Sequence, residues 1–121
     1  MIVGIGIDIV EIHRIKKAIE SSRFVDKIYT LDEQEYLKVR KQNVNTAAGY
    51  FAAKEAMAKA LGTGIGQVKW VEIEITRIGN GKPNIKLHGQ AKTIMDDMGG
   101  RNILLSISHS REYAVAQVII C

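Results

Sequence analysis

The first ten residues alternate so that both faces of an extended chain would be apolar. One face carries the side chains of Val3, Ile5, Ile7 and Ile9. The other face carries isoleucine, glycine and valine together with a single charge, that of Asp8. Strands that are apolar on both faces are typical of buried positions in a sheet. We therefore predict a buried β-strand over residues 2–10, with Asp8 near its end.

The longest helical pattern covers Ala47–Gly62. Its alanines and its Lys, Glu, Met and Leu residues are strong helix formers, and Gly62 is the type of residue that ends a helix in the left-handed conformation. At helical spacing Tyr50, Met57 and Leu61 form an apolar stripe. We predict a buried helix against which the other elements pack.

Shorter helices are indicated around this segment. Isoleucines recur at helical spacing from Glu11 to about Ser21, among several basic residues. Thr30 and Glu33 have the spacing of a capping box, which predicts a helix that runs to about Arg40. Residues 90–98 show a short amphipathic pattern that ends at two glycines.

Two hairpins are predicted in the second half of the chain. Residues 70–76 alternate strictly between apolar and polar, and an Asn-Gly turn signal precedes a return strand near residues 84–87. Pro83 confines that return strand to a sheet edge or a strand start. Residues 103–108 and 113–120 are rich in Ile, Val, Leu and Ala, so we expect both strands to be central.

These patterns together predict an α+β fold, an antiparallel sheet with one long central helix and several shorter helices. The chain has 121 residues, which suits a single domain over residues 1–121. No apolar run approaches the ~20 residues of a membrane span, and the apolar N-terminus lacks the basic segment of a signal peptide. We expect a cytoplasmic protein with no membrane partner.

Charge and cysteine content narrow the choice of partners. The net charge of +4 and the pI near 9.3 make an acidic or polyanionic partner plausible. The few aromatic residues are scattered, which makes a poor stacking platform for single-stranded nucleic acid, and we expect no nucleic-acid partner. Cys121 is the only cysteine, so neither an intramolecular disulfide nor a cysteine-based metal cluster can form.

Asp8 and Glu55 are carboxylates in places where burial is expected. Asp8 has capping-box spacing to Glu11, so it either caps the next helix or binds a cation at the strand end. Glu55 either forms a surface ion pair with Lys59, four residues on, or points its charge into a cleft. The pattern around each residue leaves both alternatives open.

A shared hard cation would satisfy both carboxylates. Burial of an unpaired carboxylate is costly, and Mg²⁺ typically takes one or two carboxylates together with water and substrate phosphates. Lys54, Lys59 and Lys82 are then candidates to meet the phosphate charge. The residues therefore point to Mg²⁺-dependent phosphate chemistry.

Two other patterns have weaker chemical implications. The turn Gly62-Thr63-Gly64 could cradle an anion with backbone N–H groups, but the Lys-Ser/Thr end of a P-loop is missing. His109 lies between two serines, yet neighbours on a strand point to opposite faces and no nucleophile elbow is present. A Ser-His catalytic triad is therefore disfavoured.

Five segments, in order and spacing, resemble the bacterial holo-acyl-carrier-protein synthases, which are 4′-phosphopantetheinyl transferases. These segments are Gly6–Glu11, Phe51–Ala56, Gly62–Gly64, Asn80–Pro83 and Ser106–Ser110. The resemblance runs essentially from end to end. It implies transfer of 4′-phosphopantetheine from coenzyme A to a serine of acyl carrier protein in fatty acid biosynthesis, with release of adenosine 3′,5′-bisphosphate. It also implies a homotrimer with active sites at the subunit interfaces.

The resemblance also implies roles for individual residues. Asp8 and Glu55 match the Mg²⁺ ligands, and Lys59 matches a lysine near the diphosphate. Coenzyme A would be surrounded by the segments that contain Lys54, Lys59, Gly62, Gly64, Lys82, Pro83 and His109. Acidic acyl carrier protein would dock on the basic segment that contains Arg14, Lys17, Arg23 and Lys27.

Tyr50 departs from the family pattern, because relatives commonly carry arginine at this position. If that arginine meets a nucleotide phosphate, then either Arg40, Lys41 or a neighbouring subunit replaces it here, or coenzyme A binds more weakly. Two rival functions are a small basic binding module without catalysis and a Mg²⁺-dependent phosphohydrolase that needs no carrier. Labelling of apo-acyl carrier protein with coenzyme A and Mg²⁺ separates the three.

Overall fold

The computed structural model describes residues 1–40 and 43–121, and the predicted α+β class is confirmed. Its elements, in order, are β1 (Gly4–Glu11), α1 (Ile12–Ala18), α2 (Ser22–Ile28), α3 (Leu31–Val39), α4 (Asn43–Ala60), the 3₁₀ turn η1 (Trp70–Glu72), β2 (Ile73–Arg77), β3 (Pro83–Leu87), α5 (Gly89–Asp97), β4 (Ile103–His109) and β5 (Tyr113–Ile120). Lys41, one of the expected substitutes for the family arginine, lies outside the described residues.

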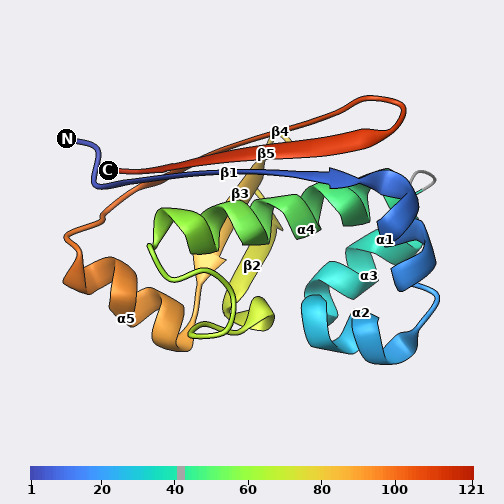
Figure 1. Ribbon diagram of the computed structural model, residues 1–121, viewed down its shortest axis with the longest axis horizontal. Helices are drawn as coiled ribbons and strands as arrows, with labels where there is room; N and C mark the ends of the chain where they lie inside the picture. Colours follow the sequence, from blue (N-terminus) through green and yellow to red (C-terminus); the bar gives the residue numbers. More distant parts are fainter. Residues whose placement is uncertain (41–42) are drawn as a thin grey trace.

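Two antiparallel sheets frame the long helix α4. The larger sheet has the strand order β1-β5-β4, and the smaller consists of the hairpin β2-β3. The helix runs beneath the three-stranded sheet, the hairpin crosses it, and α1, α2 and α3 gather towards its N-terminal end (Figure 1). The helix is therefore the central element, as predicted.

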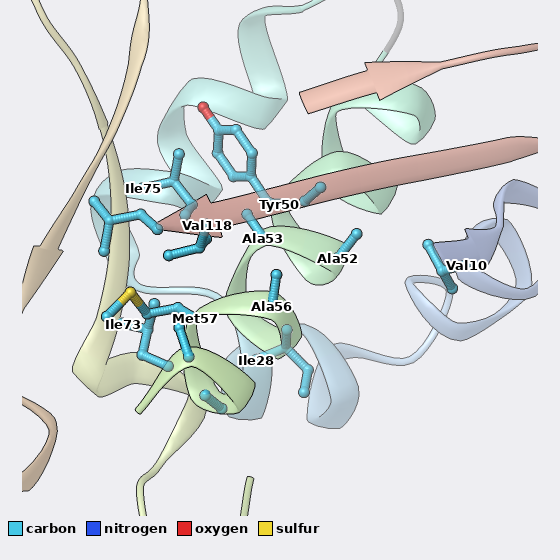
Figure 2. Packing of buried hydrophobic residues seen from close by; sticks show 14 of the residues in the cluster. Val10, Ile28, Tyr50, Ala52, Ala53, Ala56, Met57, Ile73, Ile75 and Val118 are labelled. Carbon is cyan, nitrogen blue, oxygen red and sulfur yellow. The ribbon is translucent and has the colours of Figure 1, made fainter. Parts of the chain in front are cut away.

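Small side chains let α4 lie close to its neighbours. Ala52, Ala53, Ala56 and Met57 are completely buried, together with apolar residues of both sheets such as Val118. Figure 2 shows these side chains gathered between α4 and the strands. Because alanine adds little bulk to the helix, the backbones approach closely and the helix is covered on most sides.

Glycines on β1 allow the closest contact between sheet and helix. A Cβ atom at Gly6 would lie 1.9 Å from the carbonyl oxygen of Ala56, and one at Gly4 would lie 2.3 Å from that of Ala60. No side chain fits into such a space, since these neighbours are backbone atoms. The two glycines therefore set the distance between β1 and α4, which in turn sets the position of Asp8.

Several local predictions are confirmed. Thr30 and Glu33 form the predicted capping box at the start of α3. The two hairpins form as expected, with Gly81 at a positive φ of 83° in the first turn and Pro83 as the first residue of β3. These features depend on neighbours in sequence, which explains why the pattern predicts them.

The three-stranded sheet differs from the prediction in one respect, because its outer face is exposed. Ile5, Ile7 and Ile9 are 60, 59 and 61 % exposed, so the expectation of a strand buried on both faces is wrong for the single chain. The strand β4 is an edge strand rather than a central one, although β5 is central as predicted.

Several element boundaries also differ, among them those of α4 and β2. The helix α4 begins at Asn43, four residues before the predicted start at Ala47. Residues 70–72 form the 3₁₀ turn η1 instead of the first part of a strand, and the strand β2 starts only at Ile73.

Candidate active site

Asp8 lies on the face of β1 that is turned towards α4. Its Oδ1 atom is 3.2 Å from Nζ of Lys59, which also donates a hydrogen bond of 3.0 Å to the carbonyl oxygen of Ile7. The helix-cap interpretation of Asp8 is wrong, because α1 begins only at Ile12 and its N-cap residue Glu11 makes no side-chain cap. The Asp8 carboxylate is therefore available for another role.

Glu55 approaches the same place from α4, one turn before Lys59. The pKa of Glu55 is raised, first by burial and then by the negative charge of Asp8, while Lys59 opposes the shift. Lys59 makes its ion pair with Asp8 across to the strand rather than with Glu55 along the helix, so the surface-pair interpretation of Glu55 is not supported. The two carboxylates are close enough to repel each other.

The pKa of Asp8 is raised as well. Burial of the carboxyl group is the largest cause, and the hydrogen bond and positive charge of Lys59 oppose it. Only 15 % of the Asp8 side chain is exposed, against 50 % for Lys59. The site thus combines two carboxylates that are costly to ionise with one partly exposed ammonium group.

These two carboxylates fit a Mg²⁺ ion whose remaining ligands are water molecules and substrate oxygens. Within residues 1–40 and 43–121, no group of three or more His, Cys, Asp or Glu side chains could hold a metal. A pair of facing carboxylates suffices for Mg²⁺, which usually retains waters and binds substrate phosphates as well. A bound cation would also relieve the repulsion between Asp8 and Glu55.

The glycine turn after α4 is not the backbone anion cradle considered above. The N–H groups of Gly62, Thr63 and Gly64 donate to carbonyl oxygens in the last turns of α4, at 3.0, 3.2 and 3.2 Å. Gly62 and Gly64 have φ values of 79° and 64°, in the left-handed region. The turn closes the helix directly after Lys59 and Ala60, the last two residues of α4.

Lys54 must be removed from the set of substrate-binding residues. Its side chain is completely buried, and its Nζ atom lies 2.8 Å from Oε1 of Glu33, whose side chain is equally buried. The ammonium group also donates to the carbonyl oxygens of Trp70 and Ile73. Lys54 therefore ties α4 to α3 and β2, and the removal of one partner of such a pair typically costs about 3–5 kcal/mol.

Pro83 and His109 line a second hollow of about 230 Å³, which we call the arginine pocket. Its wall also includes Arg40, Tyr50 and Arg77. Lys82, which precedes Pro83, is exposed. Two of the predicted coenzyme A residues therefore share one cavity with two arginines, and none of the lining residues is acidic.

Tyr50 is buried where an arginine was expected, and Arg77 from β2 reaches its hydroxyl group. The Nε atom of Arg77 donates a hydrogen bond of 3.1 Å to the Tyr50 oxygen. Arg40, one of the expected substitutes, is exposed at the rim, with its guanidinium 5.3 Å from the ring centre of Tyr36. The pocket thus contains a guanidinium group that comes from a different element than the sequence indicated.

The carboxylate pair and the arginine pocket lie on opposite sides of α4. Asp8 is paired with Ala116, and Ala116 with Ile107 of the pocket wall, so the whole width of the sheet separates them. With strands about 4.8 Å apart this width is about 10 Å. A single chain therefore divides the predicted site residues between the β1 edge and the β4 edge.

The predicted docking residues are all on the surface. Arg14 and Lys17 on α1 and Arg23 and Lys27 on α2 are exposed. Arg14 lies close enough to Asp8 for its charge to lower the Asp8 pKa slightly. The basic surface therefore adjoins the carboxylate pair.

Comparisons with known proteins identify the family. The 4′-phosphopantetheinyl transferase superfamily matches residues 4–118, and the chain belongs to this family. It is 53 % identical over 120 residues to a holo-[acyl-carrier-protein] synthase from Alkaliphilus oremlandii, with 98 % of each chain covered. A relative with the same name from Natranaerobius thermophilus is 46 % identical over 122 residues, with 99 % of this chain and 98 % of the relative covered.

Solved structures agree with this assignment. A holo-(acyl-carrier-protein) synthase from Bacillus anthracis in complex with CoA (3′,5′-ADP) has a TM-score of 0.84 and 42 % identity, and 99 % of this chain and 96 % of that chain are covered. The Helicobacter pylori enzyme in complex with coenzyme A has a TM-score of 0.84 and 34 % identity, with 97 and 99 % coverage.

Sequence reasoning missed two functional or structural side chains. Glu33 was recognised only as a capping residue, yet its carboxylate also accepts a hydrogen bond from the N–H of Ile75 and forms an ion pair with Lys54. Arg77 was not singled out, although it lines the pocket. The sequence does contain a signal for Arg77. It lies six residues before Pro83 across a tight hairpin, so the two are strand partners, and Pro83 is one of the predicted coenzyme A residues.

Proposed function

We propose that the chain is a holo-[acyl-carrier-protein] synthase that uses Mg²⁺ held by Asp8 and Glu55. It transfers 4′-phosphopantetheine from coenzyme A to a serine of apo-acyl carrier protein, within a single domain over residues 1–121. The observation that carries this proposal is the ion pair of Asp8 on β1 with Lys59 on α4, together with Glu55, which lies on α4 close enough to Asp8 for that charge to raise its pKa. The single cysteine supports a reducing, cytoplasmic location.

The transfer exchanges one phosphorus–oxygen bond for another. The serine Oγ of the carrier loses its proton to solvent and forms a bond to the phosphorus that bears pantetheine, and the bond from that phosphorus to the bridging oxygen breaks, so that adenosine 3′,5′-bisphosphate leaves with the electron pair of that bond. Bound Mg²⁺ supplies neutralisation of the diphosphate charge. Asp8 and Glu55 hold the ion, and the half-exposed ammonium group of Lys59 can approach the charge that develops on the leaving phosphate.

We propose further that the protein is a homotrimer whose sites are completed by neighbouring chains. The outer face of the larger sheet carries exposed apolar side chains on all three strands, among them Ile5, Ile7, Ile9, Leu104 and Tyr113. Such a patch is typical of an interface. A ring of three chains would place the carboxylate pair of one chain next to the arginine pocket of its neighbour. The predicted site residues, which lie far apart within one chain, would then form one site.

Acidic acyl carrier protein is the proposed partner of Arg14, Lys17, Arg23 and Lys27. We expect Arg14→Glu to raise the KM for the carrier roughly 5- to 20-fold, because reversed charges at a docking surface slow association. The KM for coenzyme A should stay constant. Steady-state kinetics with Lys86→Glu, an exposed lysine on β3, provides the matched control. An unchanged carrier KM in Arg14→Glu would remove this residue from the docking surface.

The proposed function is tested by incubation with coenzyme A and Mg²⁺ in the presence and absence of apo-carrier. A transferase releases adenosine 3′,5′-bisphosphate only when the carrier is present and labels the carrier serine. A phosphohydrolase would release products without the carrier. A binding module would neither release products nor label the carrier.

None of the helices in residues 1–40 and 43–121 has the length and apolar character of a membrane span.

A further inference from the structure

We propose that the buried ion pair between Lys54 and Glu33 fixes the rotation of α4 and thereby holds Glu55 close to Asp8. The inference rests on the proposed function and adds Lys54 to it as a positioning residue. Because its side chain is completely buried, Lys54 meets no substrate, and it acts through the next residue of the helix. The contacts of its ammonium group and the surface of α4 support this role.

The packing of α4 does not by itself define which side of the helix faces β1. Alanine methyl groups are short and alike, so they let elements approach closely but interlock little. At about 100° per residue, the buried alanines are spread around most of the helix rather than along one stripe. These residues are Ala47, Ala48, Ala52, Ala53, Ala56, Ala58 and Ala60. A directional contact is therefore needed to set the rotation.

The ammonium group of Lys54 supplies such a contact. It has three N–H donors and three partners, which are Oε1 of Glu33 at 2.8 Å and the carbonyl oxygens of Ile73 at 2.6 Å and Trp70 at 3.1 Å. The partners belong to three other elements, α3, β2 and η1. A rotation of α4, or a slide by one residue of about 1.5 Å, would break these bonds where no water can replace them.

The carboxylate of Glu33 is held just as firmly. Its Oε1 atom accepts a hydrogen bond of 2.8 Å from the N–H of Thr30, and its Oε2 atom accepts one of 2.6 Å from the N–H of Ile75. Thr30 is the N-cap residue of α3, and Ile75 lies within β2. Glu33 therefore cannot follow a movement of Lys54 without losing these two bonds, and the pair is anchored in the backbone of its neighbours.

The position of Glu55 follows from that of Lys54. Successive helix residues point about 100° apart, so a helix that directs Lys54 to β2 and α3 directs Glu55 to a neighbouring side. That side lies near β1, where Gly6 meets the backbone of Ala56 and the charge of Asp8 acts on Glu55. Functional groups need to be held within about 0.5 Å. Residues that orient metal ligands typically contribute about 10–100-fold to metal affinity.

The competing explanation is that the pair only stabilises the fold. Replacement of a buried ion pair by uncharged side chains of similar size is often neutral for stability, whereas removal of one partner is costly. A purely structural role would change the melting temperature and leave the metal affinity of the folded protein as it was. A positioning role changes the metal affinity of molecules that are folded.

The test measures Mn²⁺ affinity in the absence of nucleotide by electron paramagnetic resonance of the free ion, because Mn²⁺ prefers the same oxygen ligands as Mg²⁺. The variant Lys54→Met/Glu33→Gln removes both charges and keeps the side-chain lengths. Tyr29→Phe is the control, since it removes another buried hydrogen bond to α4, that of the Tyr29 hydroxyl group to the carbonyl oxygen of Ala47 at 2.7 Å. We expect Mn²⁺ to bind about 10–100-fold more weakly to the double variant and unchanged to Tyr29→Phe.

The same double substitution is also made in Glu55→Gln protein. If Lys54 acts through Glu55, no further affinity is lost there, because the ligand that the pair positions is already missing. Equal losses with and without Glu55, an unchanged affinity of the double variant, or an equal loss in Tyr29→Phe would each overturn the proposal. A wild type that binds no Mn²⁺ would overturn it too.

Melting temperatures of all variants report whether each one folds. If the double variant does not fold, Glu33→Asp decides instead, because it keeps the charge but shortens the side chain by one methylene group. We expect a loss of about 3-fold or more in Mn²⁺ affinity there, and an unchanged affinity would overturn the proposal. Holo-carrier formation by the wild type is measured in parallel. If it occurs but Mn²⁺ affinity does not depend on the pair, only this inference fails. If the wild type forms no holo-carrier, the proposed function fails and this inference fails with it.

Discussion

Glu55→Gln is expected to lower the rate of phosphopantetheine transfer by roughly 100-fold or more at any Mg²⁺ concentration used for the wild type. Removal of groups that only support a metal ligand already costs about 10–100-fold, and Glu55 is proposed as a ligand itself. The amide keeps the shape of the side chain but cannot offer a negative charge. Initial rates over a Mg²⁺ titration measure the effect.

The same substitution should make the metal-free protein slightly more stable at neutral pH. The pKa of Glu55 is raised in the folded state, so folding favours the protonated form, and its contribution to stability is present at low pH and is lost as pH rises through the raised pKa. Glutamine resembles the protonated form at every pH. Because this carboxylate is partly exposed and screened by solvent, the effect is small, and we expect a rise in Tm of roughly 1–3 °C at pH 7 and none at pH 4.

Glu35→Gln is the matched control, since Glu35 is exposed on α3. It should change neither the rate nor the Tm. A fully active Glu55→Gln enzyme would show that Glu55 is no metal ligand. A lower Tm together with lost activity would point instead to a structural role for this carboxylate.

Ile9→Lys is expected to dissociate the proposed trimer and abolish transfer while the chain stays folded. Ile9 is 61 % exposed on the outer face of β1, beside Val115 of β5, so the lysine causes no clash within one chain. Buried in an interface, however, an unpaired ammonium group is costly. Sedimentation should give three times the 13.4 kDa chain mass for the wild type and one chain mass for the variant.

Leu31→Lys provides the control for the effect of a new surface charge. Leu31 is 80 % exposed at the start of α3, away from the outer sheet face. This variant should remain trimeric and active. Monomeric Ile9→Lys protein with wild-type activity would contradict a site shared between chains, and trimeric Ile9→Lys protein would place the interface elsewhere.

Local signals in the sequence predict most of the fold. The capping box at Thr30 and the Asn-Gly turn depend on residues within a few positions of each other, and both are confirmed. The exposure of Ile5, Ile7 and Ile9 could not be predicted in this way. An apolar alternation shows that a strand face needs cover, but it does not show whether the cover comes from the same chain or from another copy.

The candidate site was predicted in part for a similar reason. Asp8 and Glu55 are conspicuous because each charge interrupts an otherwise apolar pattern, and the structure brings them together. Lys54 was misassigned because its partner Glu33 is 21 positions away, on another helix. Arg77 was overlooked because its contact with Tyr50 spans 27 positions and forms only when the hairpin β2-β3 packs across α4.

The central claim is that Asp8 and Glu55 hold a Mg²⁺ ion on which transfer to the carrier depends. Intact-mass spectrometry of apo-carrier tests it most directly, after incubation with coenzyme A and either wild-type or Asp8→Asn protein, with Mg²⁺ or with a chelator. We predict that the carrier gains the mass of one phosphopantetheine group only with the wild type and Mg²⁺. Full conversion by the wild type in chelator, or by Asp8→Asn protein in Mg²⁺, would contradict the account.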